Sequence, residues 1–239
     1  MKRALLFLCV GLFIALVLQP NIANSSNEKD IRVPQIGESA PVTNEDITQS
    51  SSQSKIRIGI DASHGGADLG YVGNNEIPEK EINLELALRV GRKLQAAGYE
   101  VVYTRQDDNV DASGEDLVNA QRLSDMQAQD VDFLLSFQSG NTTDPLMKGF
   151  TIFTRPDEQN VALANEIGQE LVAINFSNYE GIDTDHYSNF SILSNRNIPT
   201  ILIELGYLSN PEDYTRLTDP DYQEKIGQAI TNAFLNEIQ

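Results

Sequence analysis

Three side chains that could take part in chemistry lie directly after short apolar runs in this sequence. His64 follows a β-branched apolar run and sits in a glycine-rich turn, where the small glycines let backbone and ligand approach the imidazole. Gln138 follows the run 131–137, and Glu204 follows the strongly apolar run 200–203. A carboxylate at the end of a buried strand costs free energy unless it binds a metal or accepts hydrogen bonds. A histidine, an amide and a carboxylate at strand ends are groups that could serve a site, and the rest of the chain has to decide whether they do.

Two of these residues also have a simpler interpretation. His64 is equally consistent with a surface histidine in a tight loop. Glu204 is also consistent with a carboxylate that caps a neighbouring helix. The arrangement of the surrounding elements must decide between these interpretations.

The elements that position these side chains alternate along the chain. Short apolar runs predict strands, and apolar residues at three- and four-residue spacing predict helices. The predicted strands cover residues 58–61, 99–104, 131–137, 149–154, 190–193 and 199–205. The predicted helices cover residues 82–97, 117–129, 158–174 and 221–238. Residues 176–189 are predicted as a polar loop. This alternation predicts a three-layer α/β fold, with a mostly parallel twisted sheet of about six strands and helices on both faces. Because ligands bind at the carboxyl ends of such strands, we expect His64, Gln138 and Glu204 in one crevice.

Composition excludes several classes of function. The 239 residues carry a formal net charge of -18, so no basic surface is available for nucleic acid, and anionic lipid headgroups are disfavoured. The single cysteine, Cys9, lies in the N-terminal leader, which leaves the folded part without a thiolate metal site or a cysteine nucleophile. A metal site in this chain must therefore use histidine, carboxylate and amide ligands.

The first 54 residues are expected to lie outside the folded domain. Residues 1–23 carry basic residues followed by an apolar segment, which predicts either a signal peptide or an N-terminal membrane anchor. Residues 24–54 are polar and aperiodic, so we predict a disordered linker before a domain at residues 55–239. Both alternatives predict an exported protein of the periplasm, the cell envelope or the medium, with membrane contact only through residues 1–23. We expect a monomer.

Several short motifs follow one another in order from residue 56 to the C-terminus. They are Asp61 with His64-Gly65-Gly66 and Gly70, Glu79-Lys80 with Asn83-Leu84, Thr104-Arg105, Arg122, Asp132 with Ser136, Lys148-Gly149-Phe150, Pro199, and Glu204-Leu205-Gly206-Tyr207-Leu208-Ser209-Asn210-Pro211. In this order they resemble the motifs of the zinc-dependent N-acetylmuramoyl-L-alanine amidases, whose catalytic domain cuts the stem peptides of peptidoglycan from the glycan.

The resemblance implies that His64 and Glu79 are zinc ligands and that Glu204 is the catalytic carboxylate. The third zinc ligand of that family is a histidine, and Gln138 stands at its position here. Three alternatives remain for the third ligand: the amide oxygen of Gln138, a water molecule, or His186. Catalytic zinc normally uses three protein ligands and an open position for water, so the glutamine weakens the expected zinc affinity.

Two further residues have two interpretations each. Asp61 either orients His64 or caps the end of the first strand. Arg105 either binds a carboxylate of the stem peptide or forms a surface ion pair with Asp107 or Asp108.

Two hypotheses follow for the function. The first is an exported zinc amidase that hydrolyses the bond between N-acetylmuramic acid and L-alanine, with Glu204 as general base and acid. The alternative is a catalytically impaired amidase-like domain that acts as a peptidoglycan-binding or regulatory module of the cell envelope. Both hypotheses predict peptidoglycan as the ligand.

Overall fold

The computed structural model describes residues 55–73, 77–110 and 115–238. The predictions for residues 1–23 and 24–54 lie outside the described residues. Among the described helices, none has the length and apolar character that a membrane span requires.

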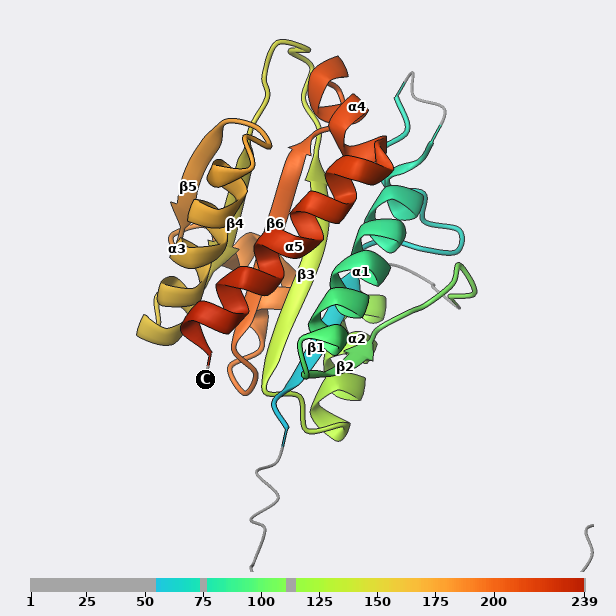
Figure 1. The fold of residues 1–239 in the computed structure, drawn as a ribbon. Coiled ribbons are helices and arrows are strands. Elements are labelled where there is room, and N and C mark those ends of the chain that lie inside the picture. Colours follow the sequence, from blue (N-terminus) through green and yellow to red (C-terminus); the bar gives the residue numbers. More distant parts are fainter. Residues whose placement is uncertain (1–54, 74–76, 111–114, 239) are drawn as a thin grey trace, which may run out of the picture. The chain divides into compact units, whose positions relative to one another are not determined.

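The described chain builds a six-stranded sheet with the order β2-β1-β3-β6-β4-β5 (Figure 1). The strands are β1 (Arg57–Ala62), β2 (Glu100–Tyr103), β3 (Phe133–Gly140), β4 (Phe150–Thr154), β5 (Tyr179–Asp183) and β6 (Thr200–Tyr207). Every neighbouring pair is parallel except β4 against β6, so β4 and β5 run opposite to the other four strands. The predicted α/β fold with a mostly parallel sheet is confirmed.

Helices lie on both faces of the sheet. One face is covered by α1 (Glu79–Ala96), α3 (Glu158–Ala173) and α5 (Pro220–Glu237), and Figure 1 shows these three helices side by side in front of the strands. The other face is covered by α2 (Glu115–Ala128) with the short 3-10 helices η1 (Tyr187–Asn189) and η2 (Ser191–Ser194). The described chain therefore forms the predicted three layers.

Alternation along β3 and β6 divides their side chains between the two layers. Phe137 and Ile203 belong to the larger core beneath α1 and α5, whereas Leu134 and Leu202 belong to the smaller core beneath α2. Successive side chains of a strand point to opposite faces, which places residues 138 and 204 on the face of α2. Gln138 and Glu204 therefore enter the site from this face, whereas Glu79 enters it from the start of α1.

The structure extends or replaces some predicted elements. The third strand does not end at Phe137, because Gln138 and Gly140 continue the ladder against β6. The predicted loop 176–189 contains the edge strand β5, and the predicted strand 190–193 is instead 3-10 helix. The first difference is tertiary in origin, since β5 is an edge strand whose neighbour in the described sheet is β4.

One helix was missed by sequence analysis. The turn at Asn210-Pro211 begins α4 (Pro211–Thr218), and the Asn210 side chain accepts hydrogen bonds from the backbone N–H groups of Glu212 and Asp213. An asparagine N-cap followed by proline at the first helical position is a common way to begin a helix.

Candidate active site

The turn after β1 holds His64 in an unusual backbone conformation. The φ angle of His64 is 65°, in the left-handed region, which costs about 1–3 kcal/mol for a residue other than glycine. Two buried arginines stabilise the turn through three successive carbonyl oxygens. Arg105 donates to the carbonyl oxygens of Ala62 and Ser63 at 3.0 and 3.2 Å, and Arg122 donates to that of His64 at 2.6 Å.

The Asp61 carboxylate supports this turn through Thr104, Ser136 and Arg122, and none of its described contacts is with the imidazole. Its buried carboxylate accepts hydrogen bonds from the hydroxyls of Thr104 and Ser136 at 2.8 and 2.6 Å. It also lies 3.4 Å from the guanidinium of Arg122. Asp61 therefore ties β1 to β2 and β3, and it reaches His64 only through Arg122.

Arg105 is buried and directs its donors to backbone oxygens. In addition to the turn, it donates to the carbonyl oxygens of Lys80 at 2.7 Å and Asp107 at 3.2 Å. No ion pair joins it to the side chains of Asp107 or Asp108 in the described part of the chain. Arg105 therefore links the turn to the first residues of α1.

The His64 imidazole is held between two carboxylates. Its Nδ1 lies 2.8 Å from Asp68 Oδ2, and its Nε2 lies 3.3 Å from Glu79 Oε1. A Cβ atom at Gly70 would come within 2.7 Å of the imidazole ring, so glycine is required for this packing. Burial alone would lower the pKa of His64, but Glu79 and Asp68 outweigh it and raise the pKa to about 9.

Glu79 is the first residue of α1 and is only 2% exposed. Its Oε2 accepts from the backbone N–H of Tyr71 at 2.9 Å, and its Oε1 accepts from the backbone N–H of Ser139 at 2.9 Å and from the Asn83 amide at 3.2 Å. Burial opposes ionisation, yet His64 and these N–H donors lower the pKa of Glu79 below its usual range. Its position at a helix N-terminus also favours the ionised form.

Glu204 has the opposite electrostatic environment. Burial comes first, and repulsion from Glu79 and Glu180 adds to it, so the pKa of Glu204 rises to about 7. Residues 138–140 of β3 lie next to both carboxylates: the Ser139 N–H donates to Glu79, and Gln138 pairs with Glu204 in the ladder. Gly140 leaves room there, because a Cβ at that position would lie 2.9 Å from Glu204 Oε1.

The structure places Gln138 and His186 differently. Gln138 is the direct neighbour of Glu204 in the β3–β6 ladder, so it lies at the same crevice. His186 lies on the exposed segment after β5, where its Nδ1 is 2.8 Å from Asp183 Oδ2. Its link to the site is that it lines a groove that Glu204 also lines.

The donor set fits a divalent ion in part. The buried Nε2 of His64 has no hydrogen-bond partner and faces the Glu79 carboxylate, which is an arrangement that a bound cation would complete. Among the described residues, no group of three or more His, Cys, Asp and Glu side chains is placed to hold a metal. His64 and Glu79 are therefore the two side chains of this site whose chemistry suits a divalent ion, and Gln138 is the neutral side chain beside them.

Sequence analysis missed Asp68, Glu180 and Tyr207. Asp68 lies four residues after His64 in the same glycine-rich turn, which is a usable sign that it contacts the imidazole. Glu180 gave no such sign, because it belongs to the strand that was predicted as a loop. Its carboxylate accepts from the hydroxyls of Thr151 and Tyr207 at 3.2 and 3.3 Å.

Comparison with known proteins adds a family to this geometry. Residues 58–236 match the family described as N-acetylmuramoyl-L-alanine amidase. The uncharacterized protein YqiI of Bacillus subtilis is 31% identical over 176 residues, which cover 72% of this chain and 80% of YqiI. The probable cell wall amidase LytH of Staphylococcus aureus is 28% identical over 198 residues, which cover 80% of this chain and 62% of LytH.

A solved structure supports the same relationship. The catalytic domain of CwlV, an N-acetylmuramoyl-L-alanine amidase from Bacillus (Paenibacillus) polymyxa var. colistinus, superimposes with a TM-score of 0.67 at 27% identity. The match covers 76% of this chain and 99% of that domain.

Proposed function

This chain belongs to the N-acetylmuramoyl-L-alanine amidase family, and from that premise we propose that it hydrolyses the amide bond between N-acetylmuramic acid and L-alanine in peptidoglycan. The family and the relatives named as amidases favour a hydrolase over the non-catalytic peptidoglycan-binding alternative. We further propose that the protein is exported and acts in the cell envelope, as the name of LytH indicates for that relative.

Glu204 is the proposed general base. Its pKa of about 7 matches the requirement that a base be largely ionised, yet still able to hold a proton, near neutral pH. It takes a proton from the attacking water as the water oxygen bonds to the carbonyl carbon. It then gives that proton to the alanine nitrogen as the carbon–nitrogen bond breaks, which leaves a carboxylate on the muramic acid and a free amine on the peptide.

His64 and Glu79 are the proposed metal ligands, with the Gln138 amide oxygen as a weak third ligand. A zinc ion bound there would supply the positive charge that activates water and polarises the carbonyl group. Asp68 holds the imidazole from its Nδ1 side, so Nε2 is directed toward Glu79. The observation that carries the proposal is this placement of a paired His64–Glu79 next to an unpaired, proton-binding Glu204.

The test measures release of stem peptides from purified peptidoglycan by mass spectrometry. With excess zinc, the wild-type protein should release peptides with a free N-terminal alanine, and Glu204→Gln should lower the rate about 10²–10⁴-fold, the usual contribution of a general base. Glu81→Gln, an exposed carboxylate on the same helix as Glu79, serves as the matched control and should retain the wild-type rate.

Gln138→His separates the two hypotheses. It restores an imidazole at the third ligand position, so zinc affinity should rise about 10–100-fold while the wild-type protein remains active at high zinc. An inert wild-type protein with an active Gln138→His variant would instead establish the non-catalytic alternative.

A further inference from the structure

A groove of about 460 Å³ extends from Glu204 across the edge of the sheet. Thr151 and Phe153 of β4 and Glu180 of β5 line it together with part of Ile182, whose side chain packs against the larger core, and Tyr207 of β6 lies beside Glu204. The opposite face of these two strands is packed against α3. The groove has a volume in the range of pockets that bind small organic ligands, and it adjoins the proposed base directly.

The charge of the groove limits which part of a substrate it can hold. Its wall contains the carboxylates of Glu180, Asp183, Asp185 and Glu204, and none of the described residues that line it is a lysine or an arginine. Its one basic side chain, His186, is already paired with Asp183. A substrate segment with free carboxylates would be repelled here, because like charges across an interface are unfavourable.

The groove also offers acceptors and an aromatic side chain. Both hydrogen bonds of the Glu180 carboxylate, from Thr151 and Tyr207, go to Oε2, which leaves Oε1 available on an exposed side chain. The Tyr207 ring adds an amphipathic surface with an apolar face and a polar tip. Carboxylate acceptors beside an aromatic face suit an uncharged ligand with many hydroxyl and amide N–H donors.

We propose that this groove binds the glycan strand of peptidoglycan, a chain of N-acetylhexosamines whose muramic carboxyl groups are uncharged as long as they are amide-linked to stem peptides. The stem peptide, which carries free carboxylates, leaves Glu204 in another direction. The inference rests on the proposed function, because it divides the two arms of the same substrate. It assigns Glu180 and Tyr207 as residues that determine which arm lies over the β4–β5 edge.

The experiment compares two probes by backbone amide NMR of the protein. An uncharged N-acetylglucosamine tetrasaccharide should shift the amide signals of Thr151, Glu180 and Ile182 in a saturable manner. A free stem peptide should leave these three signals unchanged. Shifts from the stem peptide at these positions, or no saturable shift from the saccharide, would overturn the proposal.

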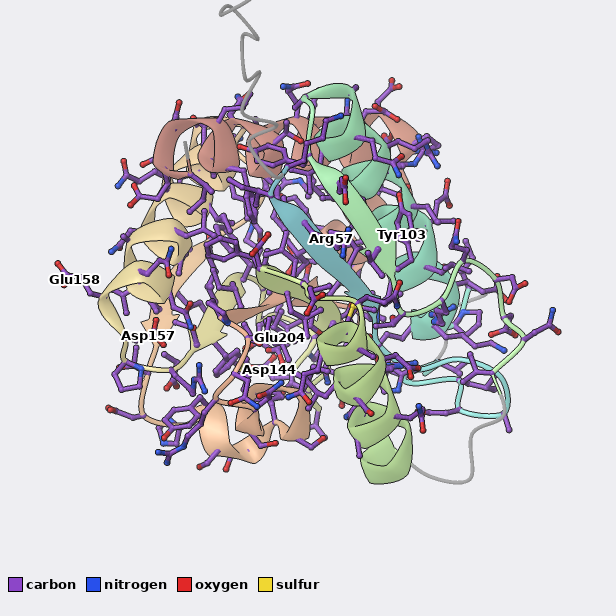
Figure 2. The ribbon with its side chains drawn as sticks, turned by 90° about the horizontal axis from the view of Figure 1, so that it is seen from below. Arg57, Tyr103, Asp144, Asp157, Glu158 and Glu204 are labelled. Atoms are coloured by element: carbon purple, nitrogen blue, oxygen red, sulfur yellow. The ribbon has the colours of Figure 1, made fainter. Side chains whose placement is uncertain are left out.

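A charge reversal tests the role of the groove directly. Glu180→Lys should weaken saccharide binding at least tenfold and allow the stem peptide to bind at the groove. Glu158→Lys is the matched control, because Glu158 is an exposed carboxylate that points outward at the start of α3, away from Glu204 (Figure 2). Equal saccharide affinity in the wild type, Glu180→Lys and Glu158→Lys would contradict the assignment.

A parallel assay of stem-peptide release keeps the two proposals distinct. If the wild-type protein releases stem peptides but the saccharide does not reach the groove, only the groove assignment fails. If no stem peptide is released at any zinc concentration while the saccharide still shifts the groove signals, the proposed function fails and the groove assignment stands.

Discussion

Glu79 and Glu204 are two carboxylates of one site with opposite electrostatic environments. Both lose hydration, and for both that loss is the largest effect on the pKa. Glu79 recovers the cost through His64 and backbone N–H donors, so its pKa is lowered. For Glu204, burial and the nearby charges of Glu79 and Glu180 act in the same direction, so its pKa is raised to about 7. The comparison shows that partners, rather than burial, decide whether a carboxylate in this crevice is held ionised or binds a proton near neutral pH.

The largest effect is expected when the charge of Glu79 is removed. Glu79→Gln keeps a side chain that can accept the N–H donors but removes the charge that pairs with His64. The pKa of His64 should then fall well below about 9, because burial lowers it and only Asp68 remains to raise it. Zinc affinity at neutral pH should fall at least about 100-fold, since a ligand is lost rather than one of its supports.

NMR titration of the His64 ring and competition with a zinc chelator would measure these changes. His186 provides an internal reference, because it is exposed and pairs with Asp183. Glu81→Gln on the same helix should change neither quantity. An unchanged His64 pKa in Glu79→Gln would mean that Glu79 is not its partner.

A smaller effect is expected when the Glu204 carboxylate is removed, and this change should raise the stability of the fold rather than weaken an interaction. Because the folded pKa of about 7 exceeds the ordinary value of 4.5, ionising Glu204 destabilises the fold. This penalty is absent below pH 4.5 and fully present above about pH 7. Glu204→Gln should therefore raise the free energy of unfolding by about 1–3 kcal/mol at pH 8 and leave it nearly unchanged at pH 4.

Denaturant unfolding at the two pH values would test this sign. Glu79→Gln should do the reverse and lower stability above pH 5, because the folded pKa of Glu79 is depressed and its ionised form is the stabilised one. If both variants changed stability in the same direction at pH 8, the contrast between the two carboxylates would be wrong.

The smallest effect is expected when the charge of Glu180 is removed, because this reduces one part of the repulsion on Glu204. Glu180 is exposed and contributes less to the raised pKa of Glu204 than burial and Glu79 do. Glu180→Gln should lower the pKa of Glu204 by a fraction of a unit, as expected for a screened charge. The acid limb of the kcat pH profile should move to lower pH by the same amount, while Glu158→Gln leaves it in place. A shift toward higher pH would contradict the repulsion between these side chains.

Local sequence determined much of the framework. Alternating strand and helix patterns predicted the α/β fold, because apolar periodicity depends only on which face each element buries. The positions of His64 and Glu204 after apolar runs predicted a shared crevice, since parallel strands bring their carboxyl ends together. The resemblance supplied Glu79 as the partner of His64. These features depend on residue order and residue type alone.

Tertiary structure decided how the residues are used. Contacts between distant segments assign Asp61 and Arg105 to the support of the His64 turn. The folded conformation of that turn places Asp68 on the imidazole. The edge strand β5 exists because β4 reverses beside β6, and that reversal brings Glu180 toward Glu204. Sequence can identify a titratable side chain, but its pKa depends on the charges and N–H groups that folding brings within a few ångströms. For that reason Glu79 and Glu204, which are the same amino acid, became distinct only in the folded protein.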